Sequence, residues 1–203
     1  MPLIRKDPAG TSAKPAAPAA DLLTRGAVDE RWSAARAVGD EPGAVERLAL
    51  ALASETEPRV REAILTNLVR RDTDAAVMAI APQIRSDDAA RRSAALDALR
   101  AMPLRLQKRL PELVSDPDPD VRLLSVDLAR GLNASDATSL ILDLLERETE
   151  VNVCAAAIDA LAETGDERAL PGLSKCASRF PDEAFLQFAI RAAASRLAAS
   201  ASD

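Results

Sequence analysis

An acidic helix-start motif recurs along the chain at a nearly constant interval. Its clearest copy is DPDVR at 118–122, and related runs begin at Glu57, Asp88 and Glu150. The successive steps are 31 residues from 57 to 88, 30 residues from 88 to 118 and 32 residues from 118 to 150. A step of that size, held over most of a chain, predicts a stack of similar structural units that bury their apolar faces against one another.

Each copy of the motif has the chemistry of a helix N-terminus. Asp118 can accept a hydrogen bond from a free backbone N–H of the first turn. Pro119 suits the first helical position, where its missing N–H costs nothing. Glu57-Pro58 repeats this arrangement with a poorer cap. Apolar residues then follow at offsets of three, four, seven and eight, which predicts a helix with one buried face.

The pattern predicts helices in consecutive pairs from about residue 29. First helices are predicted at 29–38, 58–70, 89–101, 119–131 and 151–163. Their partners are predicted at 43–53, 73–85, 104–114, 135–147 and 167–179, followed by an unpaired helix at 182–197. Gly, Asn and Pro in the short links stop and restart the helices. We therefore predict an all-α repeat domain over 21–199, a disordered Pro/Ala-rich tail at 1–20 and a disordered end at 200–203.

The composition argues against most enzyme classes. The chain has no histidine and no tyrosine, which removes the commonest general base and the commonest metal ligand. Two cysteines alone do not complete a four-ligand zinc site, and no Gly-rich loop opens a helix to hold a phosphate. We predict a non-enzymatic protein with no catalytic residues, no metal and no cofactor.

Charge and hydropathy limit the classes of partner and the cellular compartments that suit the chain. The net charge of −6 argues weakly against nucleic-acid binding, which needs a basic surface. No apolar run is long enough to span a bilayer, and residues 1–7 lack the apolar core of a signal peptide. These features predict a cytoplasmic protein whose partner is neither a membrane nor, by preference, a nucleic acid.

The motifs resemble a known repeat family. DPDPDVR at 116–122, an Ala/Leu-rich helix, a short turn and then DERALPGL at 166–173 are similar to the HEAT-like repeats also seen in phycobilisome-lyase-type proteins. The resemblance covers about 29–197 and indicates a bacterial HEAT repeat protein. It implies a right-handed α-α superhelix, the HEAT-like α-solenoid, with about five helix pairs plus one C-terminal helix. It also implies that second helices line a concave face and that the protein is an adaptor or scaffold for another protein.

Basic residues on the second helices are the first candidates for a partner surface. The segment near 104–114 holds three bases against one acid, Glu112, so an acidic protein partner would suit it. Bases at helix C-termini also complement the helix dipole without any ligand, and the sequence leaves both interpretations open. The candidates are Arg85, Arg105, Lys108, Arg109, Arg147, Lys175 and Arg179.

The predicted last helix carries two apolar stripes but has only the preceding pair to pack on. One stripe includes Phe185 and Phe188. The other is the candidate surface for a homodimer or a protein partner, because contiguous exposed apolar area usually has a function. Its members are Leu186, Ile190, Ala193 and Leu197. The alternative is a helix that tilts and buries both stripes as a terminal cap.

Two further features have more than one interpretation. Cys154 and Cys176 each lie 11 residues from Gly165, the centre of a predicted helical hairpin, so they can face each other. They are either a redox pair or thiol attachment point, or two small buried apolar residues, as free cysteines usually are. Trp32, the only tryptophan, is either a plug for the N-terminal end of the stack or a partner hot spot.

One arginine recurs at the same place in three copies of the motif. Arg61, Arg92 and Arg122 recur with the motif and form either a binding ladder or a structural ladder with the acids four residues earlier.

A scaffold is the leading function. The alternatives are an accessory subunit of a lyase- or isomerase-type complex that handles a tetrapyrrole-like ligand, and a nucleic-acid-binding repeat protein.

Overall fold

A computed structural model describes residues 19–39 and 42–200, and every regular element in these ranges is a helix. The elements are α1 (Ala19–Arg25), α2 (Val28–Ala37), α3 (Ala44–Ser54), α4 (Pro58–Arg71), α5 (Asp74–Ile80), the 3₁₀ helix η1 (Ala81–Arg85), α6 (Ala89–Arg100), α7 (Pro103–Gln107), α8 (Leu110–Leu113), α9 (Pro119–Ala129), α10 (Ala134–Arg147), α11 (Val151–Thr164), α12 (Ala169–Arg179) and α13 (Ala184–Ser200). Of the segments predicted to be disordered, 1–18 and 201–203 lie outside the described residues.

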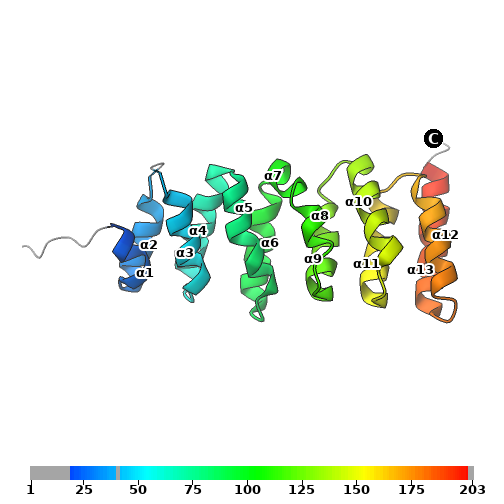
Figure 1. The fold of residues 1–203 in the computed structure, drawn as a ribbon, viewed down its shortest axis with the longest axis horizontal. Helices are drawn as coiled ribbons and strands as arrows, with labels where there is room; N and C mark the ends of the chain where they lie inside the picture. Colours follow the sequence, from blue (N-terminus) through cyan, green and yellow to red (C-terminus); the bar gives the residue numbers. More distant parts are fainter. Residues whose placement is uncertain (1–18, 40–41, 201–203) are drawn as a thin grey trace, which may run out of the picture.

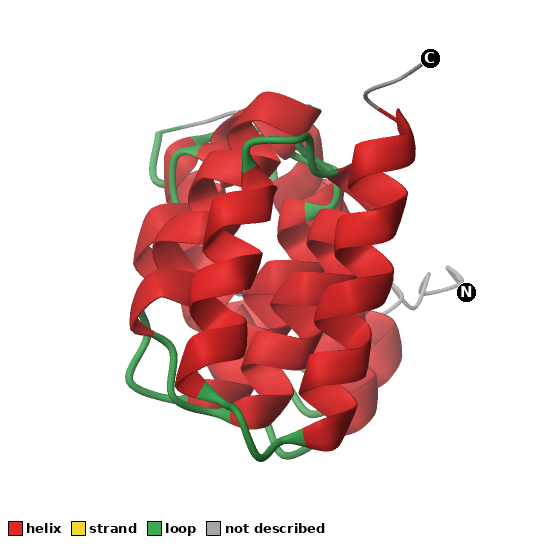
Figure 2. Cartoon of the chain, turned by 90° about the vertical axis from the view of Figure 1, so that its right-hand side faces the viewer, coloured by secondary structure: helices red, strands yellow, loops and turns green. Residues whose placement is uncertain are grey.

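The helices form an elongated stack of two layers (Figures 1 and 2). The first layer contains α2, α4, α6, α9, α11 and α13, and each helix contacts the next one along the stack. The second layer contains α1, α3, α5 with η1, α7 with α8, α10 and α12. The fold is an α-solenoid, as the 30-residue period predicts.

The predicted helix starts are present with the predicted chemistry. The Asp118 carboxylate accepts the backbone N–H of Asp120 at 2.9 Å, and Pro119 is the first residue of α9. Asp88 caps α6 in the same way, whereas Glu57 makes no side-chain cap at the start of α4. Side-chain capping therefore helps to fix where α6 and α9 begin, whereas α4 has only the local signal of Pro58 at its first position.

Two predicted second helices are broken, and one helix was not predicted. The segment 73–85 divides into α5 and η1 at Pro82, and 104–114 divides into α7 and α8 just before Pro111. Proline lacks the N–H that a continuous α-helix needs and collides with the preceding turn. Helix α1 begins at Ala19, inside the predicted tail, and contacts both α2 and α3. It covers the N-terminal end of the stack and buries Leu23.

Helix α13 corrects the prediction for the C-terminal surface. Leu186, Ile190, Ala193 and Leu197 are buried, because α13 continues the first layer and packs on α11. The outward stripe is the other one, in which Phe185 and Phe188 are 68% and 65% exposed. The prediction that the Leu186 stripe is an exposed partner or dimer surface was therefore wrong.

A recurrent ion pair joins the two helices of a pair, and we call it the hairpin ion pair. In α9–α10 it is bidentate, with Arg122 Nε 2.7 Å from Glu148 Oε2 and Arg122 Nη2 2.8 Å from Glu148 Oε1. In α2–α3 the corresponding pair is Arg31 and Glu55, with contacts of 2.8 and 3.0 Å. Both acids end a second-layer helix, and each also accepts the backbone N–H two residues later.

The helix pair α4–η1 lacks its carboxylate. Ser86 occupies the position of Glu55 and Glu148, where it still accepts the N–H of Asp88 at 3.2 Å. The matching arginine, Arg61, is 4% exposed, one of its terminal nitrogens has no hydrogen-bond partner, and its nearest acid oxygen is 3.9 Å away. A buried cation without a close counter-charge is destabilising.

Supplying that carboxylate should stabilise the protein. We expect Ser86→Glu to raise the free energy of unfolding by about 1–2 kcal/mol, because it gives the buried Arg61 a charged acceptor. Chemical denaturation of Ser86→Glu and of the neutral control Ser86→Gln measures this effect. The gain has to disappear in an Arg61→Met background, and a gain that persists there would show that Arg61 is not its cause.

Candidate functional site

The predicted second-layer bases all contact other parts of the chain. Arg105 lies 3.5 Å from Asp74, Lys108 lies 3.6 Å from the same carboxylate, and Arg109 pairs with Glu112 at 2.8 Å. Arg85 pairs with Asp116, and Lys175 pairs with Glu146 at 3.1 Å. Arg147 donates to Ser115 Oγ at 2.7 Å. Arg179 donates to the carbonyl oxygens of Leu145, Glu146 and Glu148.

Most of these contacts connect successive repeats. Arg147 and Arg179 stand at the ends of α10 and α12 and reach the C-terminal turn of the preceding second-layer helix. Carbonyl groups there have no partner within their own helix, and the helix dipole makes that end negative. The structure thus supports the dipole-complementing interpretation of these two bases, and it gives the other five a carboxylate partner.

Ion pairs between the repeated arginines and the acids four residues earlier were predicted, but Arg92 and Arg122 make other structural contacts. Arg122 uses Glu148, 26 residues later, rather than the acid four residues earlier. It also donates to the carbonyls of Asp116 and Pro117, and Arg92 donates to those of Ser86 and Asp87. Arg92 and Arg122 therefore tie the loop between pairs to the first-layer helix that follows it.

A basic groove lies on the first layer between α2 and α4. It has a volume of about 560 Å³ and is lined by Trp32, Arg36, Arg59, Glu62, Ala63, Thr66, Asn67 and Arg70. The guanidinium carbons of Arg36 and Arg59 lie 4.5 and 4.0 Å from the centre of the Trp32 ring. Cations at this distance are held by the electron-rich faces of the indole.

The charges in this groove are only partly neutralised. Arg59 pairs with Asp29 at 2.9 Å. Arg70 donates to the Asn67 side-chain oxygen at 2.9 Å, and the structure gives neither Arg36 nor Arg70 a carboxylate partner within residues 19–39 and 42–200. Further along the same layer, in contrast, Arg100 and Arg130 pair with Asp127 and Asp159 on neighbouring helices.

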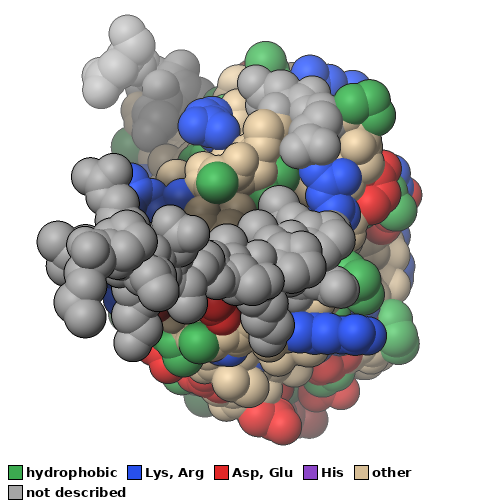
Figure 3. Space-filling view, turned by 90° about the vertical axis from the view of Figure 1, so that its left-hand side faces the viewer, with side chains coloured by type: hydrophobic (Ala, Val, Ile, Leu, Met, Phe, Trp, Pro, Cys, Tyr) green, Lys and Arg blue, Asp and Glu red, His purple; other side chains and the backbone are tan. Residues whose placement is uncertain are grey.

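Trp32 does not lie where a terminal plug would lie. Helix α1 covers that end, and the Trp32 ring contacts Arg59 of the following first-layer helix. Figure 3 views the molecule from the N-terminal end, where basic side chains occur on several sides and acidic ones gather toward the lower edge. Figure 1 shows that the first-layer helices begin at this lower edge.

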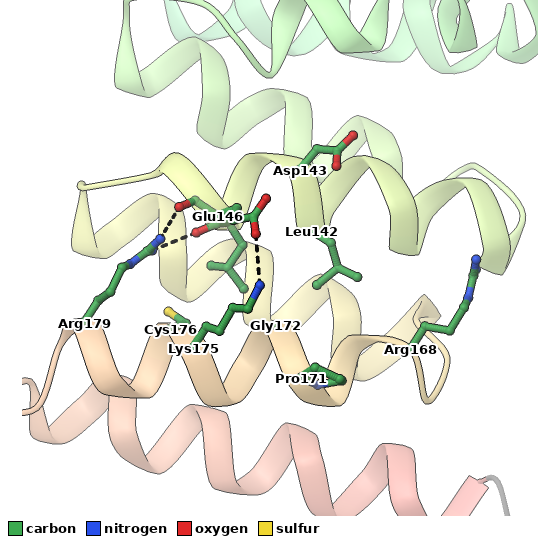
Figure 4. A pocket seen from close by; sticks show the side chains of 10 residues that line it. Leu142, Asp143, Glu146, Arg168, Pro171, Gly172, Lys175, Cys176 and Arg179 are labelled. Atoms are coloured by element: carbon green, nitrogen blue, oxygen red, sulfur yellow. Dashed lines mark hydrogen bonds and ion pairs between the residues drawn. The ribbon is translucent and has the colours of Figure 1, made fainter.

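A smaller pocket of about 190 Å³ lies between α10 and α12 (Figure 4). Its charged side chains are Asp143 and Glu146 from α10, and Arg168, Lys175 and Arg179 from α12 or its ends. Gly172 allows the two helices to approach, because a Cβ there would collide with Leu142. The Cys176 side chain is part of the pocket wall.

The two cysteines are buried neighbours, as the hairpin register predicted. Cys154 and Cys176 are both free thiols and fully buried. Contact with the Cys154 thiol lowers the pKa of Cys176 against the opposing effect of burial, and the nearby Arg179 guanidinium lowers it further. The same contact, together with burial, raises the pKa of Cys154. The pair therefore loses its first proton from Cys176.

In residues 19–39 and 42–200 there is no group of three or more His, Cys, Asp or Glu side chains placed to hold a metal ion. None of the helices in that part of the chain combines the length and apolar character needed to cross a bilayer.

Residues 106–197 match the family of HEAT repeats. This match begins in α7 and ends in α13, and it supports the HEAT-like resemblance over that half of the stack. The comparison with curated proteins found no match. The phycobilisome-lyase type and the bacterial origin stay predictions.

Among solved structures, the chain is similar to designed and engineered proteins. Two crystal structures of engineered proteins share 16% and 18% identity with it, each at a TM-score of 0.43. The matched region covers 89% of this chain and 95% of the first engineered chain, and 88% of this chain and 96% of the second. A designed armadillo repeat protein has 15% identity and a TM-score of 0.41, over 88% of this chain and 98% of its own.

Proposed function

We propose that this α-solenoid is a non-enzymatic scaffold that binds an acidic segment of a protein partner in the groove between α2 and α4. The observation that carries the proposal is the Trp32 groove, where the exposed Arg36 and Arg70 have no carboxylate partner among the described residues. A cytoplasmic location is part of the same proposal.

The groove supplies the two kinds of contact that such a segment needs. Arg36 and Arg70 present planar guanidinium groups that can each take a carboxylate through two parallel hydrogen bonds. Trp32 contributes an aromatic ring to the lining, with Arg36 and Arg59 stacked on it, and Trp and Arg are the residues that most often dominate binding energy at protein interfaces. Asn67 anchors the floor, because its side chain donates to the Ala35 carbonyl at 2.6 Å and joins α4 to α2.

The second-layer bases are a weaker site for the same partner. Arg105 and Lys108 share Asp74, and Arg109 is paired with Glu112. An incoming carboxylate would have to displace an existing ion pair at each of these positions, so the net gain in free energy would be small. The groove between α2 and α4 does not have that cost at Arg36 or Arg70.

Trp32 fluorescence provides a direct assay, because Trp32 is the only tryptophan in the chain. We expect a twelve-residue Asp/Glu-rich peptide to shift or quench the emission in a saturable titration at low salt, and a Lys-rich peptide of equal length to have no effect. The double variant Arg36→Glu/Arg70→Glu should weaken the binding at least tenfold, because it places two negative charges against the ligand.

The matched control is Lys108→Glu/Lys175→Glu, which makes the same change of charge on the second layer. This control should bind the acidic peptide with nearly the affinity of the parent protein. Equal loss of binding in both double variants would show that only the overall charge matters. Unchanged binding in the groove variant would place the acidic-segment site elsewhere.

A further inference from the structure

The helix pair α11–α12 has lost both residues of the hairpin ion pair. Cys154 stands where the earlier first-layer helices carry Arg31, Arg61, Arg92 and Arg122. Phe180 follows the last residue of α12, as Glu148 follows the last residue of α10. The start of α11 and the end of α12 are therefore not joined by charge, and the Cys154 side chain makes only a weak contact of 3.8 Å with the Glu148 carbonyl.

The neighbour of Cys154 is a second thiol, Cys176. Cys176 comes from the last part of α12 and lies next to Cys154, with both side chains closed off from solvent. Arg179, one turn further along α12, is held near the pair by its hydrogen bonds to Leu145 O at 2.7 Å and Glu148 O at 3.0 Å. A fixed guanidinium beside a thiol favours the thiolate, which is the reactive form.

The pocket between α10 and α12 borders Cys176. Cys176 forms part of its wall, and Lys175 and Arg179 flank that wall (Figure 4). The pocket volume of about 190 Å³ admits a molecule as small as hydrogen peroxide but not a folded protein. A small oxidant can therefore enter the pocket as far as the wall that Cys176 helps to form, although the thiol itself is closed off from solvent.

We propose that Cys154 and Cys176 are a peroxide-sensitive thiol pair that closes to an intramolecular disulfide between α11 and α12. In the first step the Cys176 thiolate attacks hydrogen peroxide, which gives a sulfenic acid at Cys176 and releases hydroxide. In the second step the Cys154 sulfur attacks that sulfur and the S–S bond forms, while the hydroxide that leaves the sulfenic acid takes the Cys154 proton and departs as water. Peroxide takes up the two electrons that the thiols lose.

The disulfide would replace the missing ion pair with a covalent connection. It joins the start of α11 to the end of α12, and so closes a loop that the unfolded chain otherwise leaves free. We expect oxidation to raise the Tm of the protein by about 5–10 °C. The C-terminal end of the stack would then be more stable under oxidising conditions than under reducing ones.

The test treats the full chain with a small excess of hydrogen peroxide under native conditions and follows intact mass. The parent should lose the mass of two hydrogen atoms, regain them on reduction, and yield a Cys154–Cys176 cross-linked peptide after digestion. Cys154→Ala should instead gain one oxygen at Cys176 and react with dimedone, which traps sulfenic acids. Arg179→Gln should slow the first step severalfold, and Arg179→Lys should restore most of the rate.

Two results would overturn the proposal. One is a parent protein whose thiols both stay reduced in the native state and oxidise only in denaturant. The other is a folded Cys154→Ala variant, checked by circular dichroism, in which Cys176 is no more reactive toward peroxide than it is in the Cys154→Ala/Arg179→Gln double variant. Either result would leave the cysteines as core residues only.

Discussion

Replacing Leu186 with alanine should lower the free energy of unfolding by about 3 kcal/mol, whereas replacing its neighbour Phe185 should change it by less than about 0.5 kcal/mol. Leu186 is fully buried where α13 packs on α11, and Phe185 is 68% exposed on a neighbouring face of the same helix. Truncating the leucine removes buried methyl groups and leaves a cavity, whereas truncating the phenylalanine removes atoms that already contact water.

Chemical denaturation of the two single variants measures this difference between adjacent residues of one helix. The reverse ranking would mean that α13 uses its phenylalanine stripe for packing and exposes the leucine stripe. That result would restore the assignment of the partner surface to Leu186, Ile190, Ala193 and Leu197.

Breaking the hairpin ion pair between Arg122 and Glu148 should have an effect of similar size. We expect Glu148→Gln to lower the free energy of unfolding by about 3 kcal/mol, because it leaves the guanidinium of Arg122 buried without its counter-charge. The two side chains are only 15% and 2% exposed, so solvent screens the pair weakly. The exposed Glu150→Gln, two residues later, is the matched control and should be close to neutral.

The pH dependence of this effect has a definite sign. Burial alone would raise the pKa of Glu148, but hydrogen bonds from Arg122 and from the backbone N–H groups of Glu150 and Thr149 hold it below the ordinary glutamate value of 4.5. The carboxylate therefore stabilises the fold above pH 4.5, and this stabilisation is lost as the pH falls through the lowered pKa. The difference between parent and Glu148→Gln should shrink below pH 4.5. A difference that persists unchanged in acid would assign the loss to packing rather than charge.

The repeat period and the cap chemistry were enough to predict most of the fold. Asp118 with Pro119, and Asp88, are helix starts that act within a few residues, so they can be read from the sequence. The breaks near Pro82 and Pro111 were predictable from the prolines themselves, but the predicted helices 73–85 and 104–114 ran through them. Helix α1 had no such signal, since it is short and is held by packing on α2 and α3.

The candidate sites were less accessible to sequence reasoning. Charge counts identified the bases of α7 and α8, but Arg105 and Lys108 are neutralised by Asp74, 31 and 34 residues earlier. The spacing of the apolar residues in α13 defined two stripes without saying which one faces α11. In both cases the answer depends on contacts between repeats, which a single period along the chain does not specify. The Cys154–Cys176 contact was predictable because both residues lie in one hairpin.

The most direct test of the central claim is hydrogen–deuterium exchange of the full chain with and without a saturating acidic peptide. The groove proposal predicts slower exchange in α2 and α4, over 28–37 and 58–71, and little change in the second layer. The measurement should be repeated with Arg36→Glu/Arg70→Glu, in which the protection should disappear. Protection centred on 103–113 and 134–147 instead would contradict the proposal and place the acidic partner on the second-layer bases.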